Sequence, residues 1–107
     1  MVNERIISAL SSLNIPVRYL EIKQPTDKYI IFSIYNEGDT THVENTNLEE
    51  KYYISLKYYF TNPKDLKIYK DIKRLMKENG FGFDGAGDLK EGNYKGKELD
   101  FTLEITL

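Results

Sequence analysis

The sequence predicts an α+β domain in which two helices pack on one face of a mostly antiparallel sheet, in the order α-β-β-β-α-β-β. Two segments repeat their apolar residues at helical spacing, and several others alternate apolar and polar residues as half-buried strands do. The chain has 107 residues, a length typical of one domain, so we expect residues 1–107 to form a single core.

Residues 2–13 are predicted to form the first helix. Asn14 and Pro16 follow it and are typical of a helix end. Its apolar stripe consists of Val2, Ile6, Leu10 and Leu13.

A short strand is predicted at residues 17–22, and a turn that contains Pro25 and Asp27 at residues 23–28. The apolar run YIIFSIY at residues 29–35 predicts a second strand, with its even-numbered residues on one face.

The apolar pattern lapses at residues 36–50, NEGDTTHVENTNLEE, which hold five acidic residues and no lysine or arginine. We expect a long, polar, acidic loop here, and a loop of this length in a compact domain is usually functional or disordered. It contains His42, the one histidine, which has neither a cysteine nor a second histidine to complete a zinc site.

Residues 51–60, KYYISLKYYF, alternate and predict a third strand. Asn62 and Pro63 then have the residue types of an N-cap and a first helical position, so a second helix is expected up to about residue 79. Its inner stripe consists of Leu66, Tyr69, Ile72, Leu75 and Met76.

Residues 80–88, GFGFDGAGD, contain the G-x-G-x-x-G spacing of a dinucleotide fingerprint. That fingerprint leaves a strand and opens a helix, whereas these glycines follow a helix, so we expect no nucleotide site. Gly80 instead fits the left-handed position that ends a helix, with Phe81 folding back on the helix. A bulged strand and its turn are expected around Gly82, Gly85 and Gly87.

The alternation of apolar and polar residues is clearest at the C-terminal end, where it predicts a central strand whose loss would unfold the domain. Its apolar row consists of Leu99, Phe101, Leu103, Ile105 and Leu107.

No residue pattern in the chain indicates catalysis, a cofactor or a metal site. There is no cysteine, and the residues that follow Asp84 do not have the ligand spacing of a calcium loop. The net charge of -2 gives no general attraction to nucleic acid or membrane. The N-terminal segment has no signal-peptide pattern and no apolar window is long enough to span a bilayer, so we expect no membrane partners. Because no catalytic pattern is present, we expect a non-catalytic protein.

Acidic and basic residues are concentrated in two consecutive segments of the chain. Residues 36–50 carry a net charge of −5, while residues 51–79 carry eight basic and three acidic residues, a net charge of +5. Either these are two ordinary solvated surfaces, or the acidic loop of one subunit binds the basic helix of the next in a head-to-tail contact that can close a ring. The second hypothesis places the subunit interface at Glu37, Asp39, Glu44, Glu49, Glu50, Lys67, Lys70 and Lys73.

The chain is rich in aromatic residues, with nine tyrosines and five phenylalanines. Tyr53, Lys57 and Tyr59 on the third strand have a weak likeness to a stacking platform for single-stranded nucleic acid. A small nucleic-acid-binding module that uses the lysine-rich second helix is therefore an alternative function. Such tyrosines are more typical of sheet packing and of protein interfaces.

Five elements stand out along the chain: the helix ending in LNIPV, the strand TDKYIIFSIYNEGD, the strand KYYISLKYYF, the helix ending in LMKENGF and the final alternating strand. In their order and spacing, over nearly the whole chain, these elements resemble the tail-completion proteins of long-tailed bacteriophages and prophages. It implies a non-catalytic virion protein, assembled in the host cytoplasm, whose subunits form a ring at the head-proximal end of the tail and join it to the head connector.

The partners that the resemblance implies are other phage tail and connector proteins and further copies of the chain, with no specific nucleic acid. It brings no invariant functional residues with it. The segment GFDGAGD departs from the family pattern after its first two residues.

Overall fold

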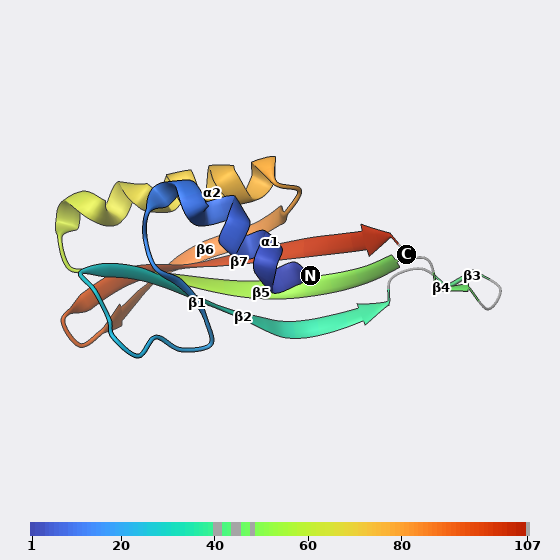
Figure 1. Ribbon diagram of the computed structural model, residues 1–107, viewed down its shortest axis with the longest axis horizontal. Coiled ribbons are helices and arrows are strands. Elements are labelled where there is room, and N and C mark those ends of the chain that lie inside the picture. Colours follow the sequence, from blue (N-terminus) through green and yellow to red (C-terminus); the bar gives the residue numbers. More distant parts are fainter. Residues whose placement is uncertain (40–41, 44–45, 48, 107) are drawn as a thin grey trace.

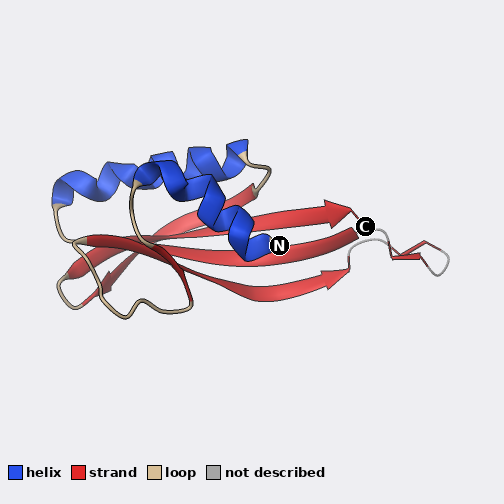
Figure 2. Ribbon diagram, in the orientation of Figure 1, coloured by secondary structure: helices blue, strands red, loops and turns tan. Residues whose placement is uncertain are grey.

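The computed structural model describes residues 1–39, 42–43, 46–47 and 49–106 of the chain, and the side chains of residues 1–39 and 49–106. The helices and strands are α1 (Val2–Leu10), β1 (Val17–Tyr19), β2 (Lys28–Asp39), β3 (His42–Val43), β4 (Thr46–Asn47), β5 (Glu49–Phe60), α2 (Ile68–Glu78), β6 (Gly82–Glu91) and β7 (Tyr94–Thr106). Two short 3₁₀ helices, η1 (Ser11–Leu13) and η2 (Pro63–Lys67), follow α1 and precede α2. Both α-helices lie on the same face of the main sheet (Figures 1 and 2), so the predicted α+β fold and element order are confirmed, with a small β3–β4 hairpin in addition.

The main sheet has the strand order β1-β2-β5-β7-β6. β1 runs parallel to β2, and the other neighbouring strands are antiparallel. β5 lies at the centre, and β7 lies between β5 and β6, an interior position that agrees with the strong alternation of its sequence. β1 pairs with β2 only as far as Phe32, so the remainder of β2 lies at one edge of this sheet and β6 lies at the other.

β1 is shorter than the strand predicted at residues 17–22. It ends at Tyr19 because Leu20 takes a φ of 68° and the Glu21 amide donates a hydrogen bond to the Tyr19 carbonyl at 2.8 Å. A three-residue turn of this kind takes the chain out of the strand direction.

The loop predicted at residues 36–50 is partly strand. β2 continues to Asp39 and β5 begins at Glu49, with Asn36 paired to Tyr53 across the ladder. Backbone hydrogen bonds hold this extension, whose side chains on β2 are exposed, so no apolar pattern marks it in the sequence. The β3–β4 hairpin lies beyond the end of the main sheet (Figure 1). We call residues 36–50 the acidic arm.

The second helix begins at the predicted place but in two parts. The Asn62 side chain accepts a hydrogen bond from the Lys64 amide at 3.0 Å, and Pro63 opens η2 before α2 begins. A 3₁₀ helix has about 3.0 residues per turn instead of about 3.6, so Leu66 leaves the stripe that α2 continues. Leu66 is 42% exposed and its predicted burial is wrong, whereas the rest of the predicted stripe packs against the core.

The core lies between the two helices and the inner face of the sheet. Its fully buried residues come from both helices and from the three inner strands: Ile6, Leu10, Ile30, Phe32, Ile54, Leu56, Tyr58, Ile72, Met76, Leu99 and Phe101. Of the predicted C-terminal row, Leu103 is also buried, Ile105 is half-buried and Leu107 lies outside the described residues.

Gly80 and Gly85 allow backbone conformations that end α2 and follow a bulge in β6, as predicted. Gly80 has a φ of 92°, its amide donates to the Lys77 carbonyl at 3.1 Å, and the Phe81 amide donates to the Met76 carbonyl at 3.1 Å. These two bonds make a Schellman motif, and Phe81 is buried against the core. Gly85, with a φ of 146°, follows a bulge at which the register of β6 shifts against β7.

Candidate interaction surfaces

The solvent-facing side of η2 and α2 carries most of the basic residues of the predicted interface. Lys67 and Lys70 are exposed and have no carboxylate partner among the described residues. Arg74, by contrast, bridges Asp71 at 3.7 Å and Glu78 at 3.4 Å. The helix therefore presents lysines whose charge is not neutralised nearby.

Lys73, the third predicted lysine, occupies a different environment. Its ammonium nitrogen lies 4.3 Å from the centre of the Phe83 ring, and the residue is half-buried between α2 and β6. A cation over an aromatic face is stabilised within its own subunit. Lys73 is thus less available to a partner than Lys67 or Lys70.

The acidic residues of the predicted interface lie at the end of the β2–β5 ladder. Glu37 and Asp39 are exposed on β2, while Glu49 and Glu50 at the start of β5 are half-buried. Glu50 accepts a hydrogen bond from the Tyr52 hydroxyl at 3.1 Å. Glu44 lies outside the described residues.

Within one chain the structure does not bring the acidic and basic halves of the predicted interface together. The molecule is 53 Å long and about half as wide. The ends of β2 and β5 that carry the arm lie at one end of the long axis, and η2 with the start of α2 lies at the other (Figure 1). A contact between the arm and this end of the helix therefore requires two copies of the chain.

On the outer face of the sheet, Tyr53 is half-buried and Lys57 is exposed, but Tyr59 is not available for stacking. Tyr59 is only 6% exposed, its ring stacks on Tyr29 with centroids 5.0 Å apart, and its hydroxyl donates to Glu91 at 3.1 Å. Burial, with this hydrogen bond, raises the pKa of Tyr59 to about 12. Tyr94 packs edge-on against Tyr29, and its hydroxyl donates to the Thr26 carbonyl at 2.8 Å. These tyrosines pack the sheet, as the residue types predicted.

Further along the same face lie the carboxylates of Asp100 and Glu98, with the exposed Lys57 directly opposite Glu98. Burial, together with the nearby carboxylates of Glu98 and Asp84, raises the pKa of Asp100 above its ordinary value. Glu98 accepts a hydrogen bond from the Ser55 hydroxyl at 2.9 Å.

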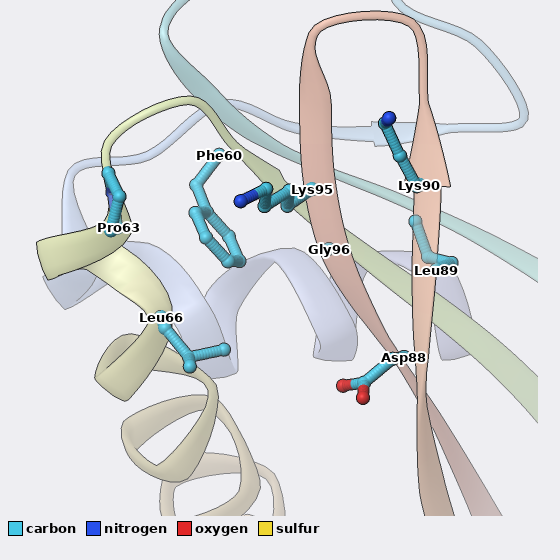
Figure 3. A pocket seen from close by; sticks show the side chains of 8 residues that line it. All are labelled: Phe60, Pro63, Leu66, Asp88, Leu89, Lys90, Lys95 and Gly96. Atoms are coloured by element: carbon cyan, nitrogen blue, oxygen red, sulfur yellow. The ribbon is translucent and has the colours of Figure 1, made fainter.

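A groove with a volume of about 560 Å³ opens between η2 and the β6–β7 hairpin. Its lining consists of Phe60, Pro63, Leu66, Asp88, Leu89, Lys90, Lys95 and Gly96 (Figure 3). Gly96 permits the close packing of this region, because a Cβ atom there would lie 2.5 Å from the Tyr58 carbonyl oxygen and 2.6 Å from the Leu89 side chain. The exposed side chain of Leu66 points into the groove from η2 (Figure 3).

The rim of the groove is basic. Lys90 and Lys95 are directly paired across β6 and β7, and both are exposed. Neither has a carboxylate partner in the part of the chain that the structure describes, because Asp88 is held by Lys97 at 2.7 Å. That hydrogen bond raises the pKa of Lys97. Like charges placed directly opposite each other in a sheet are destabilising.

Sequence reasoning missed this groove. The signal that it offered was the two-residue connection Gly92–Asn93, which pairs Glu91 with Tyr94 and therefore Lys90 with Lys95, and sequence reasoning did not locate this turn. The exposure of Leu66 depends on the switch from a 3₁₀ to an α-helix, which the periodicity did not resolve.

The described residues hold no group of three or more histidine, aspartate or glutamate side chains placed to bind a metal ion. Neither α1 nor α2 has the length and apolar character needed to cross a membrane.

Comparisons with family models and with curated proteins each found no match for the chain.

Proposed function

We propose that the chain is a non-catalytic structural and assembly protein of a long-tailed phage or prophage. It forms part of a ring at the head-proximal end of the tail, completes the tail and joins it to the head connector. The proposal is supported by the resemblance of its elements, in order and spacing, to tail-completion proteins.

The observation that carries the proposal is the separation of charge along the long axis of the molecule. An acidic arm at one end and a basic, lysine-bearing end at the other are complementary surfaces on different parts of one subunit. Complementary surfaces of this kind make a head-to-tail contact, which generates a ring when the rotation closes.

The function is tested in the assembled particle. We expect the neighbouring reading frames to encode connector and major tail proteins, and labelled antibody to mark the head-proximal end of purified tails in electron micrographs. Deletion of the gene should give tails that are unjoined and irregular in length. Metabolic neighbours, or tails that join heads normally without the protein, would contradict the proposal.

A nucleic-acid-binding module remains the second candidate, because Lys67 and Lys70 are exposed on one side of the basic helix. Binding through such lysines weakens steeply with salt. A ring component is expected to show little affinity for a random DNA duplex near physiological salt, and tight, salt-dependent binding would favour the second candidate instead.

A further inference from the structure

We infer that the groove between η2 and the β6–β7 hairpin receives the acidic arm of a second copy of this chain. The inference deepens the proposed function and rests on it, since the ring is what the contact would build. It moves the basic partner of the arm from the side of α2 to the groove and its rim.

The groove has the chemistry of a site for an acidic peptide with apolar side chains. The exposed Leu66 on η2 and the half-buried Leu89 on β6 line it from two sides (Figure 3), and its rim holds Lys90 and Lys95 without a carboxylate partner among the described residues. An occupant with apolar side chains would cover the two leucines and remove their contact with water. Its carboxylates would pair with the two lysines and offset the repulsion between them.

The arm has this composition. It holds five acidic residues and no basic one, and its sequence interleaves Val43 and Leu48 with those acids. Lys64 and Lys67 on η2 are exposed beside the groove and extend its positive rim.

The occupant has to be the arm of another copy. The groove lies at the end of the molecule that holds η2 and the β6–β7 turn, and the arm leaves the opposite end of a 53 Å axis (Figure 1). Each copy offers one arm and one groove on different surfaces, so the contact is heterologous and repeats from subunit to subunit.

The contact is tested first by disulfide trapping, which is clean because the chain has no cysteine. The variant V43C/L66C is expected to give a ladder of cross-linked species on a non-reducing gel. The matched control is V43C/I7C, because Ile7 on α1 is 44% exposed and Leu66 is 42% exposed. We expect at least about tenfold more cross-linking in the first variant, since only a specific contact holds two sulfur atoms within bonding reach. Equal cross-linking in both variants, or none in either, overturns the inference.

A charge swap tests the same contact without cysteines. K90E/K95E reverses the rim and E37K/E44K reverses the arm, and each variant alone is expected to weaken self-association by about tenfold or more. Both changes in one chain should restore association. An equimolar mixture of the two single-sided variants should also restore association, because each arm then meets a groove of opposite charge on the other variant. Self-association that ignores these changes in ultracentrifugation overturns the inference.

The two proposals fail separately. If electron micrographs show rings or joined tails but V43C/L66C does not cross-link, the arm-in-groove contact is wrong. The proposed tail function is then still supported. A trapped ladder in a protein whose deletion leaves tails unchanged removes the tail function and leaves the contact.

Discussion

Gly80 ends α2 in a conformation that other residues adopt only with strain. Its φ of 92° lets the Gly80 and Phe81 amides reach the last carbonyls of the helix and turns Phe81 into the core. A side chain at Gly80 would have room, since the nearest atom to an added Cβ is a nitrogen of the Arg5 side chain at 3.5 Å. The cost of substitution is therefore a backbone cost.

Gly80→Ala is expected to lower the free energy of unfolding by about 1–2 kcal/mol, the cost of a left-handed conformation for an L-residue. Gly87→Ala is the matched control, because a Cβ atom there meets open space and the backbone is not left-handed. Its effect should stay within about 0.5 kcal/mol. Urea unfolding measures both, and equal midpoints for the two variants would contradict the backbone role of Gly80.

Asp100 is a residue whose charge opposes folding. Its pKa is raised by burial and by Glu98 and Asp84, so the folded chain holds this proton more tightly than the unfolded chain does. The unfavourable contribution is absent below the ordinary carboxyl range, grows as pH rises through it and is complete above the raised pKa.

Asp100→Asn is therefore expected to stabilise the protein at about pH 7 and to have no such effect at about pH 2.5. Thermal unfolding at the two pH values measures the difference. A gain of the same size at both values would show that the change acts through packing and not through the charge.

β7 contributes fully buried side chains to the apolar layer. Leu99 and Phe101 are fully buried between the helices and the sheet, and Phe101 contacts Phe83 of β6 with ring centroids 5.5 Å apart. A hydrogen bond also connects the sheet to η2: the Tyr58 hydroxyl on β5 donates to the Asp65 carbonyl at 2.8 Å. Burial raises the pKa of Tyr58 well above its ordinary value, so this hydroxyl stays protonated as a donor.

Phe101→Ala is expected to cost about 3–5 kcal/mol, by loss of burial and by the cavity left behind. That is a large fraction of the roughly 5–15 kcal/mol that stabilises a domain of this kind. Ile105→Ala, at a half-buried position on the same strand, should cost clearly less. Guanidinium unfolding compares them, and an equal cost would mean that the interior of β7 is not what holds the layers together.

The elements that bury a regular apolar pattern were predictable from the sequence. The helix at α1, the stripe of α2 and the alternation in β5 and β7 all follow from periods that side-chain burial imposes. The extension of β2 to Asp39 was not predictable, because exposed residues held by backbone hydrogen bonds leave no such period. Neither was the groove, which depends on a cross-strand register and on a change of helix type at Leu66.

The molecule as a whole is elongated, and its two ends differ in charge. Its extents are 53 × 24 × 23 Å, and the acidic arm lies at the opposite end from η2, the start of α2 and the β6–β7 turn (Figure 1). The screening length is about 8 Å at physiological ionic strength, so the two ends of one copy scarcely act on each other, while facing ends of two copies attract at contact distance.

Self-association is accordingly expected to be strongest at low ionic strength. Raising monovalent salt from about 20 mM to about 500 mM should lower the weight-average mass in ultracentrifugation, because exposed charge pairs are screened. K70E serves as a comparison, since Lys70 lies on α2 outside the groove lining and should change this dependence less than K90E/K95E. A mass that does not vary with salt would contradict electrostatic assembly.

The arm continues two long strands, β2 and β5, and this connection determines how the molecule responds to a pulling force. β5 is bonded to β2 on one side and to β7 on the other for nearly all of its length. A pull on the arm along the molecular axis draws β2 and β5 in the same direction, so it loads the β5–β7 hydrogen bonds in shear, and these bonds share the force and do not open one after another. Tension applied at the tip is thereby spread through the centre of the domain, which makes the protein mechanically suited to being held by its extremity.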